Sequence, residues 1–212
     1  MTAAVLLLLV LTLAVAALDW VAVAAKVRPL EIVAKPATMV VLIAAVAAME
    51  PSSTAAKVSW IAALAFSLAG DVLLMTKRDQ LFVFGLAAFL GGHIAYVIGL
   101  WFLGVSGGLF LVGIVVVMIA VATIGLRVIK GVKAGEHAAL AAPVMAYVAA
   151  ISLMVASAIG TGRPAAIAGA VLFYASDAMI AWNRFIEPKP WGEIAIITTY
   201  HVGQIALALA LL

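Results

Sequence analysis

The sequence predicts an all-α, polytopic membrane protein with eight transmembrane helices. Of its 212 residues, 68% are hydrophobic and 10% are charged, and the mean hydropathy is +1.32. A soluble domain averages about 45–50% apolar and about 25% charged residues. No soluble core requires this much apolar surface, whereas each membrane-spanning helix requires about 20 apolar residues. We therefore expect the whole chain to form one transmembrane domain.

Short polar loops divide the apolar residues into eight runs. The first run is broken only by Asp19 and has no basic segment ahead of it, which favours a transmembrane helix over a signal peptide. The second run is short and begins with Lys35-Pro36. Proline is tolerated in a first helical turn because its missing N–H would be unpaired there. The expected spans are residues 3–25, 35–49, 55–76, 81–103, 107–129, 137–159, 163–183 and 191–211.

Basic residues alternate between the loops and predict the orientation. Only Lys57 and Arg163 lie near the even-numbered loops. The other ten of the 12 basic residues lie in or beside the odd-numbered loops: Lys26, Arg28, Lys35, Lys77, Arg78, Arg127, Lys130, Lys133, Arg184 and Lys189. The positive-inside rule then places these loops in the cytoplasm and both termini outside, and we expect a bacterial inner (plasma) membrane. Because loops explain the net charge of +3, nucleic acid is not an expected partner.

Two aspartates lie within apolar runs. Asp71 is in SWIAALAFSLAGDVLLM and Asp177 is in AAIAGAVLFYASDAMIAW. An ionisable side chain inside a bilayer costs roughly 2.5–3.5 kcal/mol on insertion scales, so it indicates function by default. His93 and His201 follow in the next runs, 22 and 24 residues later. Each histidine is expected to pair with the aspartate of the preceding helix, which suits both helix packing and general acid–base catalysis.

The two halves of the chain look duplicated. The matched positions are Pro36 with Pro143, Asp71 with Asp177 and His93 with His201, at offsets of 107, 106 and 108 residues. Spans one to four would map onto spans five to eight in the same orientation. The sequence thus predicts a 4+4 parallel repeat about an axis along the membrane normal, which would bring the two Asp–His pairs toward one site.

The candidate site residues lie in the cytoplasmic half of the spans. The candidate catalytic residues are Asp71 and Asp177. The alternative is that these two aspartates only hold helices together through hydrogen bonds or ion pairs. The candidate substrate-binding residues are Lys35, His93, Tyr96, Tyr147, Tyr174, Asn183, Tyr200, His201 and Gln204. Lys35 either extends its ammonium to the interface or holds a lipid phosphate. Asp19 and Asn183 are expected to face the membrane interface.

Metal and thiol chemistry are less favoured. Two aspartates and two histidines suit zinc, but no HxxxH or HExxH pairing sets two ligands on one helix. The chain has no cysteine, which excludes disulfides and thiol catalysis, and no GxSxG, so nothing indicates a Ser-His-Asp triad. The main interpretation therefore uses no metal and no cofactor.

Four segments carry a resemblance to a known family: FSLAGDVLLM, FGLAAFLGGHIAY, LFYASDAMIA and TYHVGQ, preceded by Lys35-Pro36. Over nearly its whole length the chain resembles the YhhN-type integral membrane proteins, the lysoplasmalogenase family. The resemblance implies eight transmembrane helices and hydrolysis of the vinyl ether bond of lysoplasmalogens. The products would be a fatty aldehyde and glycerophospho-ethanolamine or -choline, so the expected partners are a lysophospholipid substrate and membrane lipids. The family's motif positions fall on Asp71, Asp177, His93, Tyr96, Tyr200, His201 and Gln204.

Independently of this resemblance, the chemistry of vinyl ether hydrolysis suits a pair of carboxylates. Protonation of the β-carbon gives an oxocarbenium ion, water captures this cation, and the hemiacetal collapses to aldehyde and alcohol. Burial and mutual repulsion would keep one carboxyl protonated as the acid while the other serves as the base. Two alternatives remain open: a small proton-coupled transporter or lipid-binding protein, and a metal-dependent lipid amide or ester hydrolase.

Overall fold

The computed structural model describes residues 1–76, 79–135 and 138–212. Every secondary-structure element among these residues is a helix. The elements are α1 (Ala3–Ala24), α2 (Arg28–Ala48), α3 (Thr54–Met75), α4 (Asp79–Phe102), α5 (Gly107–Ala120), the π-helical turn η1 (Val121–Gly125), α6 (Leu126–Ala134), the 3₁₀ turn η2 (Ala138–Leu140), α7 (Ala141–Gly160), α8 (Pro164–Phe185) and α9 (Gly192–Leu209). The all-α prediction is confirmed for these residues.

Seven of the described helical segments are long and apolar enough to cross a membrane. The last helix, α9, is not among the seven, since Glu193, His201 and Gln204 interrupt its apolar residues. The chain is therefore a helical membrane protein. The eighth crossing and the 4+4 repeat stay predictions.

The second helix is longer than its apolar run. It begins at Arg28 rather than near Lys35, so Pro36 lies inside the helix and not in its first turn. Pro29 occupies the first turn, where it is tolerated. Glu31 pairs with Arg28 three residues before it, at 2.8 Å, and its Oε1 lies 4.0 Å from the Lys35 ammonium. These pairs continue the helix through residues that the sequence pattern assigned to a loop.

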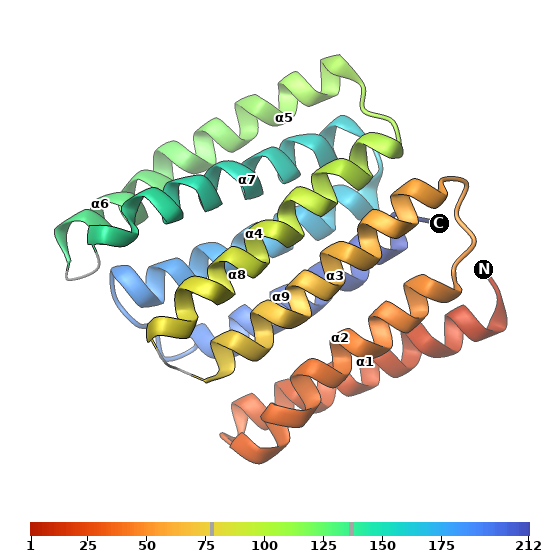
Figure 1. Cartoon of the computed structure of the whole chain (residues 1–212), viewed down its shortest axis with the longest axis horizontal. Coiled ribbons are helices and arrows are strands. Elements are labelled where there is room, and N and C mark those ends of the chain that lie inside the picture. Colours follow the sequence, from red (N-terminus) through yellow and green to blue (C-terminus); the bar gives the residue numbers. More distant parts are fainter. Residues whose placement is uncertain (77–78, 136–137) are drawn as a thin grey trace.

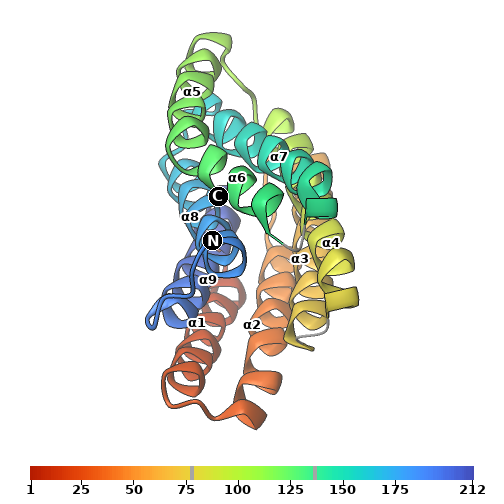
Figure 2. The same ribbon diagram turned by 90° about the vertical axis from the view of Figure 1, so that its left-hand side faces the viewer.

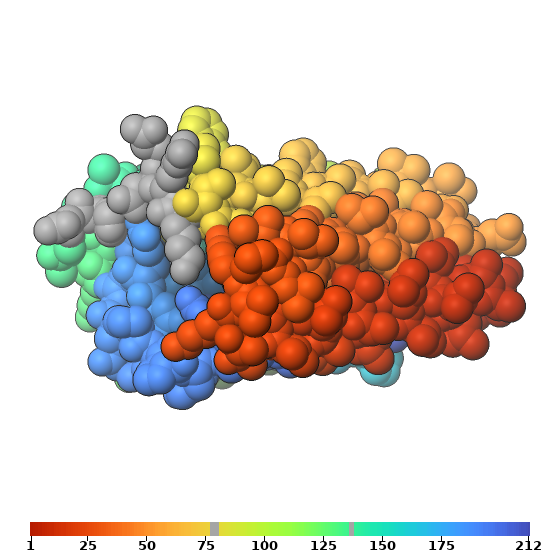
Figure 3. All heavy atoms as spheres, turned by 90° about the horizontal axis from the view of Figure 1, so that it is seen from below, coloured from red at the N-terminus to blue at the C-terminus, as the bar shows by residue number. Residues whose placement is uncertain are grey.

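The helices form a closed ring, and α5 packs against the outside of this ring. Proceeding around the ring, α1 packs on α2, α2 on α3, α3 on α4, α4 on α7, α7 on α8, α8 on α9 and α9 on α1. Figure 2 shows this ring, with α5 beyond α7 at its edge. Figure 3 shows the N-terminal helix pair (red and orange) beside C-terminal residues (blue), and α9 packs on both α1 and α2.

Glycines allow α8 and α9 to approach closely. A β-carbon at Gly169 would lie 2.7 Å from the backbone N of Leu207 and 2.8 Å from the carbonyl oxygen of Gly203. Such small residues let membrane helices pack backbone to backbone. This contact fixes α9 against α8 and so positions the polar side chains of α9 inside the ring.

Both termini lie at the same end of the bundle (Figure 1). The C-terminal ends of α1, α3, α6 and α8 and the N-terminal ends of α2, α4, α7 and α9 lie at the opposite end, and most of the described basic residues are in or beside these helix ends. Lys77 and Arg78 lie outside the described residues.

The predicted orientation can be tested with single cysteines, because the chain has none of its own. Gly107 begins α5 and Ala134 ends α6, so they lie at opposite ends of one continuous helical segment. We expect Gly107→Cys to react with an impermeant maleimide from outside intact cells, and Ala134→Cys to react only after lysis, as the positive-inside rule requires. Labelling of both from the same side would contradict the predicted topology.

Candidate functional site

Asp177 of α8 receives two hydrogen bonds on one oxygen. The Tyr147 hydroxyl, from α7, donates to Oδ2 at 2.5 Å, and Nε2 of His93, from α4, lies 3.1 Å from the same atom. The rings of His93 and Tyr147 also meet edge to face at 5.0 Å. Asp177 is 8% exposed, so its carboxyl is nearly buried but still reachable.

Asp71 of α3 is held by a tyrosine from the last helix. The Tyr200 hydroxyl donates to Asp71 Oδ2 at 2.7 Å. Beside it, Gly70 leaves room for Phe89, since a β-carbon at Gly70 would lie 2.5 Å from the Phe89 ring. Phe89 in turn packs on Tyr200, with ring centroids 5.9 Å apart. The absent side chain at Gly70 thus allows the aromatic support of the Asp71–Tyr200 pair.

The pairing crosses between the two halves of the chain. We expected each histidine to bind the aspartate of the preceding helix, and that expectation is wrong. His93 meets Asp177 rather than Asp71, and Asp71 is held by Tyr200. Neither ring nitrogen of His201 has a hydrogen-bond partner within the described residues. Each aspartate therefore has a hydrogen-bond partner on a helix from the other half of the chain.

Tyr200, rather than His201, holds an aspartate as His93 does, although the predicted repeat matches His93 with His201. It follows His93 by 107 residues, close to the offset of 106 between the two aspartates that they hold. The Tyr96 hydroxyl donates to Gln204 Oε1 at 2.5 Å, and these residues are 108 apart. The contacts are those that a parallel repeat would produce. An offset of 107 separates the two prolines as well, and this was the signal that could have identified Tyr200.

Phe173 connects the two aspartate sites, and sequence reasoning missed it. Its ring is fully buried and lies 4.9 Å from the His93 ring and 5.3 Å from the Tyr200 ring. Phe173 precedes Asp177 by four residues, so both lie on the same face of α8. That spacing was the available signal. The phenyl ring keeps the partners of both aspartates in place from a single position.

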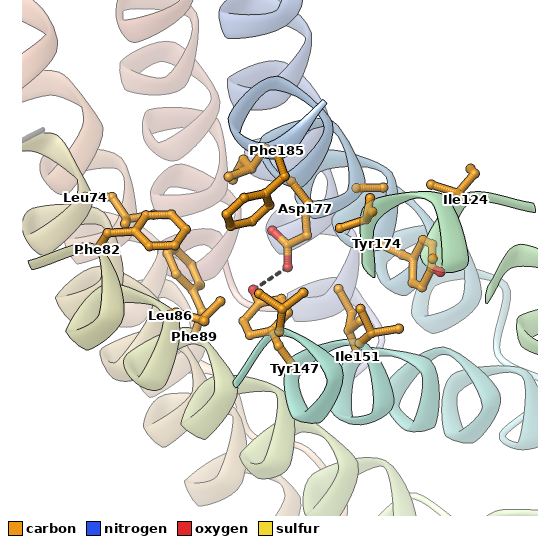
Figure 4. Close-up of a pocket in the computed structure, with 17 residues that line it drawn as sticks. Leu74, Phe82, Leu86, Phe89, Ile124, Tyr147, Ile151, Tyr174, Asp177 and Phe185 are labelled. Atoms are coloured by element: carbon orange, nitrogen blue, oxygen red, sulfur yellow. Dashed lines mark hydrogen bonds between the residues drawn. The ribbon is translucent and has the colours of Figure 1, made fainter. Parts of the chain in front are cut away.

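An apolar pocket opens beside Asp177 (Figure 4). Its cavity volume is about 70 Å³. Its wall is made by Leu74, Phe82, Leu86, Phe89, Ile124, Gly125, Val128, Val144, Tyr147, Val148, Ile151, Tyr174, Asp177, Ala178, Ile180, Ala181 and Phe185. Figure 4 shows the Asp177 carboxyl and the Tyr147 hydroxyl pointing toward one another among these apolar side chains. The pocket suits a hydrocarbon chain with a carboxyl at its wall.

A polar pocket adjoins the apolar one at the end of the bundle away from the termini. Its cavity volume is about 400 Å³. Its wall is made by Val23, Arg28, Glu31, Lys35, Leu74, Met75, Phe82, Ile180, Asn183, Arg184, Glu193, Ile196 and Ile197. The residues common to both pockets are Leu74, Phe82 and Ile180. The two pockets together offer a charged compartment next to an apolar one.

The candidate residues fall into three places. Lys35 and Asn183 line the polar pocket, and the Asn183 side-chain oxygen also accepts the backbone N–H of Lys189 at 3.2 Å. Asp177, Tyr147 and Tyr174 line the apolar pocket. The remaining candidates are buried in the bundle: Asp71, His93, Tyr96, Tyr200, His201 and Gln204.

Asp19 does not lie where the sequence predicts. The prediction places it at the membrane interface, whereas its side chain is fully buried. Helix α1 packs against both α2 and α9, and the apolar run alone does not reveal this packing. As for metals, no cluster of three or more His, Asp or Glu side chains within the described residues could hold an ion.

Comparison with known proteins identifies the family. The YhhN family model matches residues 30–211, which extend from α2 to the end of the bundle and include both aspartates. Searches of curated proteins and of solved structures return no match. The resemblance seen in the four motif segments is thus confirmed across most of the sequence, and the chain belongs to the YhhN family.

Proposed function

We propose that the protein hydrolyses the vinyl ether bond of lysoplasmalogen and releases a fatty aldehyde and a glycerophospho-alcohol. The observation that carries this proposal is the position of Asp177, at the wall of an apolar pocket that adjoins a polar one. A lysophospholipid has the same two parts, a single hydrocarbon chain and a charged head group. The bond to be cleaved joins these two parts, so it would lie near the boundary between the pockets.

The polar pocket has the cations that a phosphate requires. Lys35 and Arg28 both line it, and an ammonium or guanidinium forms strong charge-assisted hydrogen bonds with phosphate oxygens. Glu31 lies between these cations and orients both. A head group held here leaves the chain to occupy the apolar pocket.

The hydrogen bonds favour different roles for the two carboxyls. The Tyr147 hydroxyl donates to Asp177 Oδ2, and His93 donates to the same oxygen in the tautomer that carries its proton on Nε2, so both contacts stabilise the ionised form. We assign Asp177 the role of the anion that stabilises the oxocarbenium ion and accepts a proton from water. Asp71 has one donor, from Tyr200, and lies one helical turn from Leu74, which lines both pockets. We assign Asp71 the role of the acid.

The reaction then balances. The Asp71 proton adds to the β-carbon of the vinyl ether, and the resulting oxocarbenium ion is stabilised by the Asp177 carboxylate. Water adds to the cation as Asp177 takes its proton. The hemiacetal collapses when the Asp71 carboxylate takes its hydroxyl proton and Asp177 gives its proton to the glycerol oxygen, which leaves as the alcohol, so both carboxyls return to their starting states. Two-carboxylate glycosidases offer an analogy, because their two carboxyl groups stabilise a related oxocarbenium-like transition state.

A panel of lysolipids tests the proposal. Purified protein in detergent is given 1-alkenyl, 1-acyl and 1-alkyl lysophospholipids that share chain length and head group. We expect aldehyde from the alkenyl lipid and no product from the other two, because only a vinyl ether becomes an oxocarbenium ion on protonation. Fatty acid released from the acyl lipid would instead favour an ester hydrolase, and no product from any lipid would contradict hydrolysis.

The same assay separates the alternatives. A transporter needs a sealed vesicle, so aldehyde release in detergent would exclude transport as the sole activity. A metal-dependent hydrolase would lose activity after treatment with a chelator and regain it with zinc. We expect turnover by the proposed carboxyl mechanism to be unaffected by the chelator.

A further inference from the structure

Two neighbouring helices, α1 and α9, each carry a fully buried polar side chain that has no hydrogen-bond partner within the described residues. Asp19 of α1 and His201 of α9 are both 0% exposed, and α1 packs on α9. Neither carboxylate oxygen of Asp19 and neither ring nitrogen of His201 has a hydrogen-bond partner within the described residues. The indole N–H of Trp20 is also buried without a hydrogen-bond partner among the described residues, and the Trp20 ring centroid lies 6.5 Å from that of His201. Five polar atoms thus gather at one buried interface.

Burial of such groups is costly unless something satisfies them. An unpaired polar group in an apolar environment costs roughly 2–7 kcal/mol, and a buried charge costs more. Proteins meet this cost with internal water, each molecule typically making about three hydrogen bonds to buried polar groups. Carboxylate oxygens, imidazole nitrogens and an indole N–H provide both acceptors and donors for such water.

The helical register places this interface directly below the polar pocket. Asp19 lies four residues before Val23, and His201 lies four residues after Ile197; both Val23 and Ile197 line the polar pocket. Residues four apart share a helix face and are separated by about 6 Å along the axis. Asp19 and His201 therefore lie one turn deeper than the pocket wall on their own helices.

The acid of the proposed mechanism lies at the same level. Asp71 is four residues before Met75, another residue of the polar pocket wall. Its hydrogen-bond donor, Tyr200, is the chain neighbour of His201. The three buried groups thus surround the base of the pocket that Lys35 lines.

We propose that Asp19 and His201 hold water molecules that lead from the polar pocket, past Lys35 and Asp71, to the bond being cleaved, and that this path supplies the water whose proton Asp177 accepts in hydrolysis. The supply role rests on the proposed function. A lipid chain in the apolar pocket excludes water from that side, so the reacting water must enter by another route. The polar interface between α1 and α9 provides it.

Radiolytic hydroxyl footprinting tests the water directly, without any need for activity. Radicals formed from bound water modify side chains beside it even when those side chains are buried. We expect His201 to be modified and Trp60 to remain unmodified, since Trp60 is equally buried and its indole N–H donates to the Leu207 carbonyl at 2.7 Å. The label on His201 should persist in Asp19→Asn, which still bonds water, and be lost in Asp19→Leu. An unmodified His201 in the unaltered protein, or a label that survives Asp19→Leu, would overturn the proposal.

Steady-state kinetics test the supply. We expect Asp19→Leu to lower kcat about tenfold with KM unchanged, less than the loss of 10² or more that removal of a catalytic acid gives. Asp19→Asn should lose less than Asp19→Leu. Thr12→Val is the matched control on α1, because the Thr12 hydroxyl bonds only to the Leu8 carbonyl of its own helix. Equal losses in the Asn and Leu variants, or unchanged turnover in both, would overturn the supply role. If no lipid is hydrolysed, the proposed function fails on the lysolipid panel, while footprinting still decides whether the water is there.

Discussion

Replacement of either buried aspartate by asparagine is expected to lower aldehyde release by on the order of 10²-fold or more, the usual scale of general acid–base catalysis. Asparagine keeps the shape and polarity of the carboxyl but cannot donate its proton as an acid or accept one as a base. Asp71→Asn and Asp177→Asn should both remain folded, because a neutral amide is less costly to bury than an ion. The measurement is kcat on the alkenyl lysolipid, together with the thermal unfolding midpoint in detergent.

A matched control is Glu50→Gln, which makes the same chemical change at an exposed position outside the bundle core. It should leave kcat unchanged. Near-normal turnover in Asp71→Asn or Asp177→Asn would show that the altered carboxyl only holds helices together. Loss of activity that accompanies loss of folding would point to the same structural role.

Substitution of Gly169 by leucine is expected to give the largest loss of stability in the bundle. The new β-carbon would lie within 2.8 Å of backbone atoms on α9, and backbone cannot move aside as a flexible side chain can. Overpacking a core typically costs about 1–3 kcal/mol and more where nothing can yield, so the thermal midpoint should fall sharply. Separation of α8 from α9 would also draw Tyr200 away from Asp71, so activity should be lost with stability.

Gly108→Leu is the matched control for this change. Gly108 lies in α5, where a β-carbon would meet open space, so stability should be kept. A midpoint for Gly169→Leu equal to that of Gly108→Leu would contradict the close approach of α8 and α9.

The sequence was sufficient to predict the helical bundle and to select both aspartates. Apolar runs of membrane length are a local property, and Asp71 and Asp177 interrupt them visibly. The start of α2 was missed because charged residues at Arg28 and Glu31 look like a loop. Their ion pair, together with Pro29 in the first turn between them, continues the helix instead.

The partners of the aspartates could not be predicted in the same way. Which side chain meets Asp177 depends on how α4, α7 and α8 are rotated against one another, and helix packing fixes this through the whole interface. His93 therefore looked equally suited to either aspartate. Asp19 was misplaced for a related reason, since its burial depends on how α1 is rotated against α2 and α9.

The crossed pairing has a consequence for how the protein is made. Asp177 is synthesised after both of its partners, His93 and Tyr147, which precede it by 84 and 30 residues. Asp71 instead precedes Tyr200 by 129 residues. At synthesis rates of about 5–20 residues per second, Asp71 waits roughly 6 to 26 s for its hydrogen-bond donor. During biogenesis the third helix thus enters the membrane with its carboxyl unpaired, and the site closes only when the last helix of the nascent chain arrives.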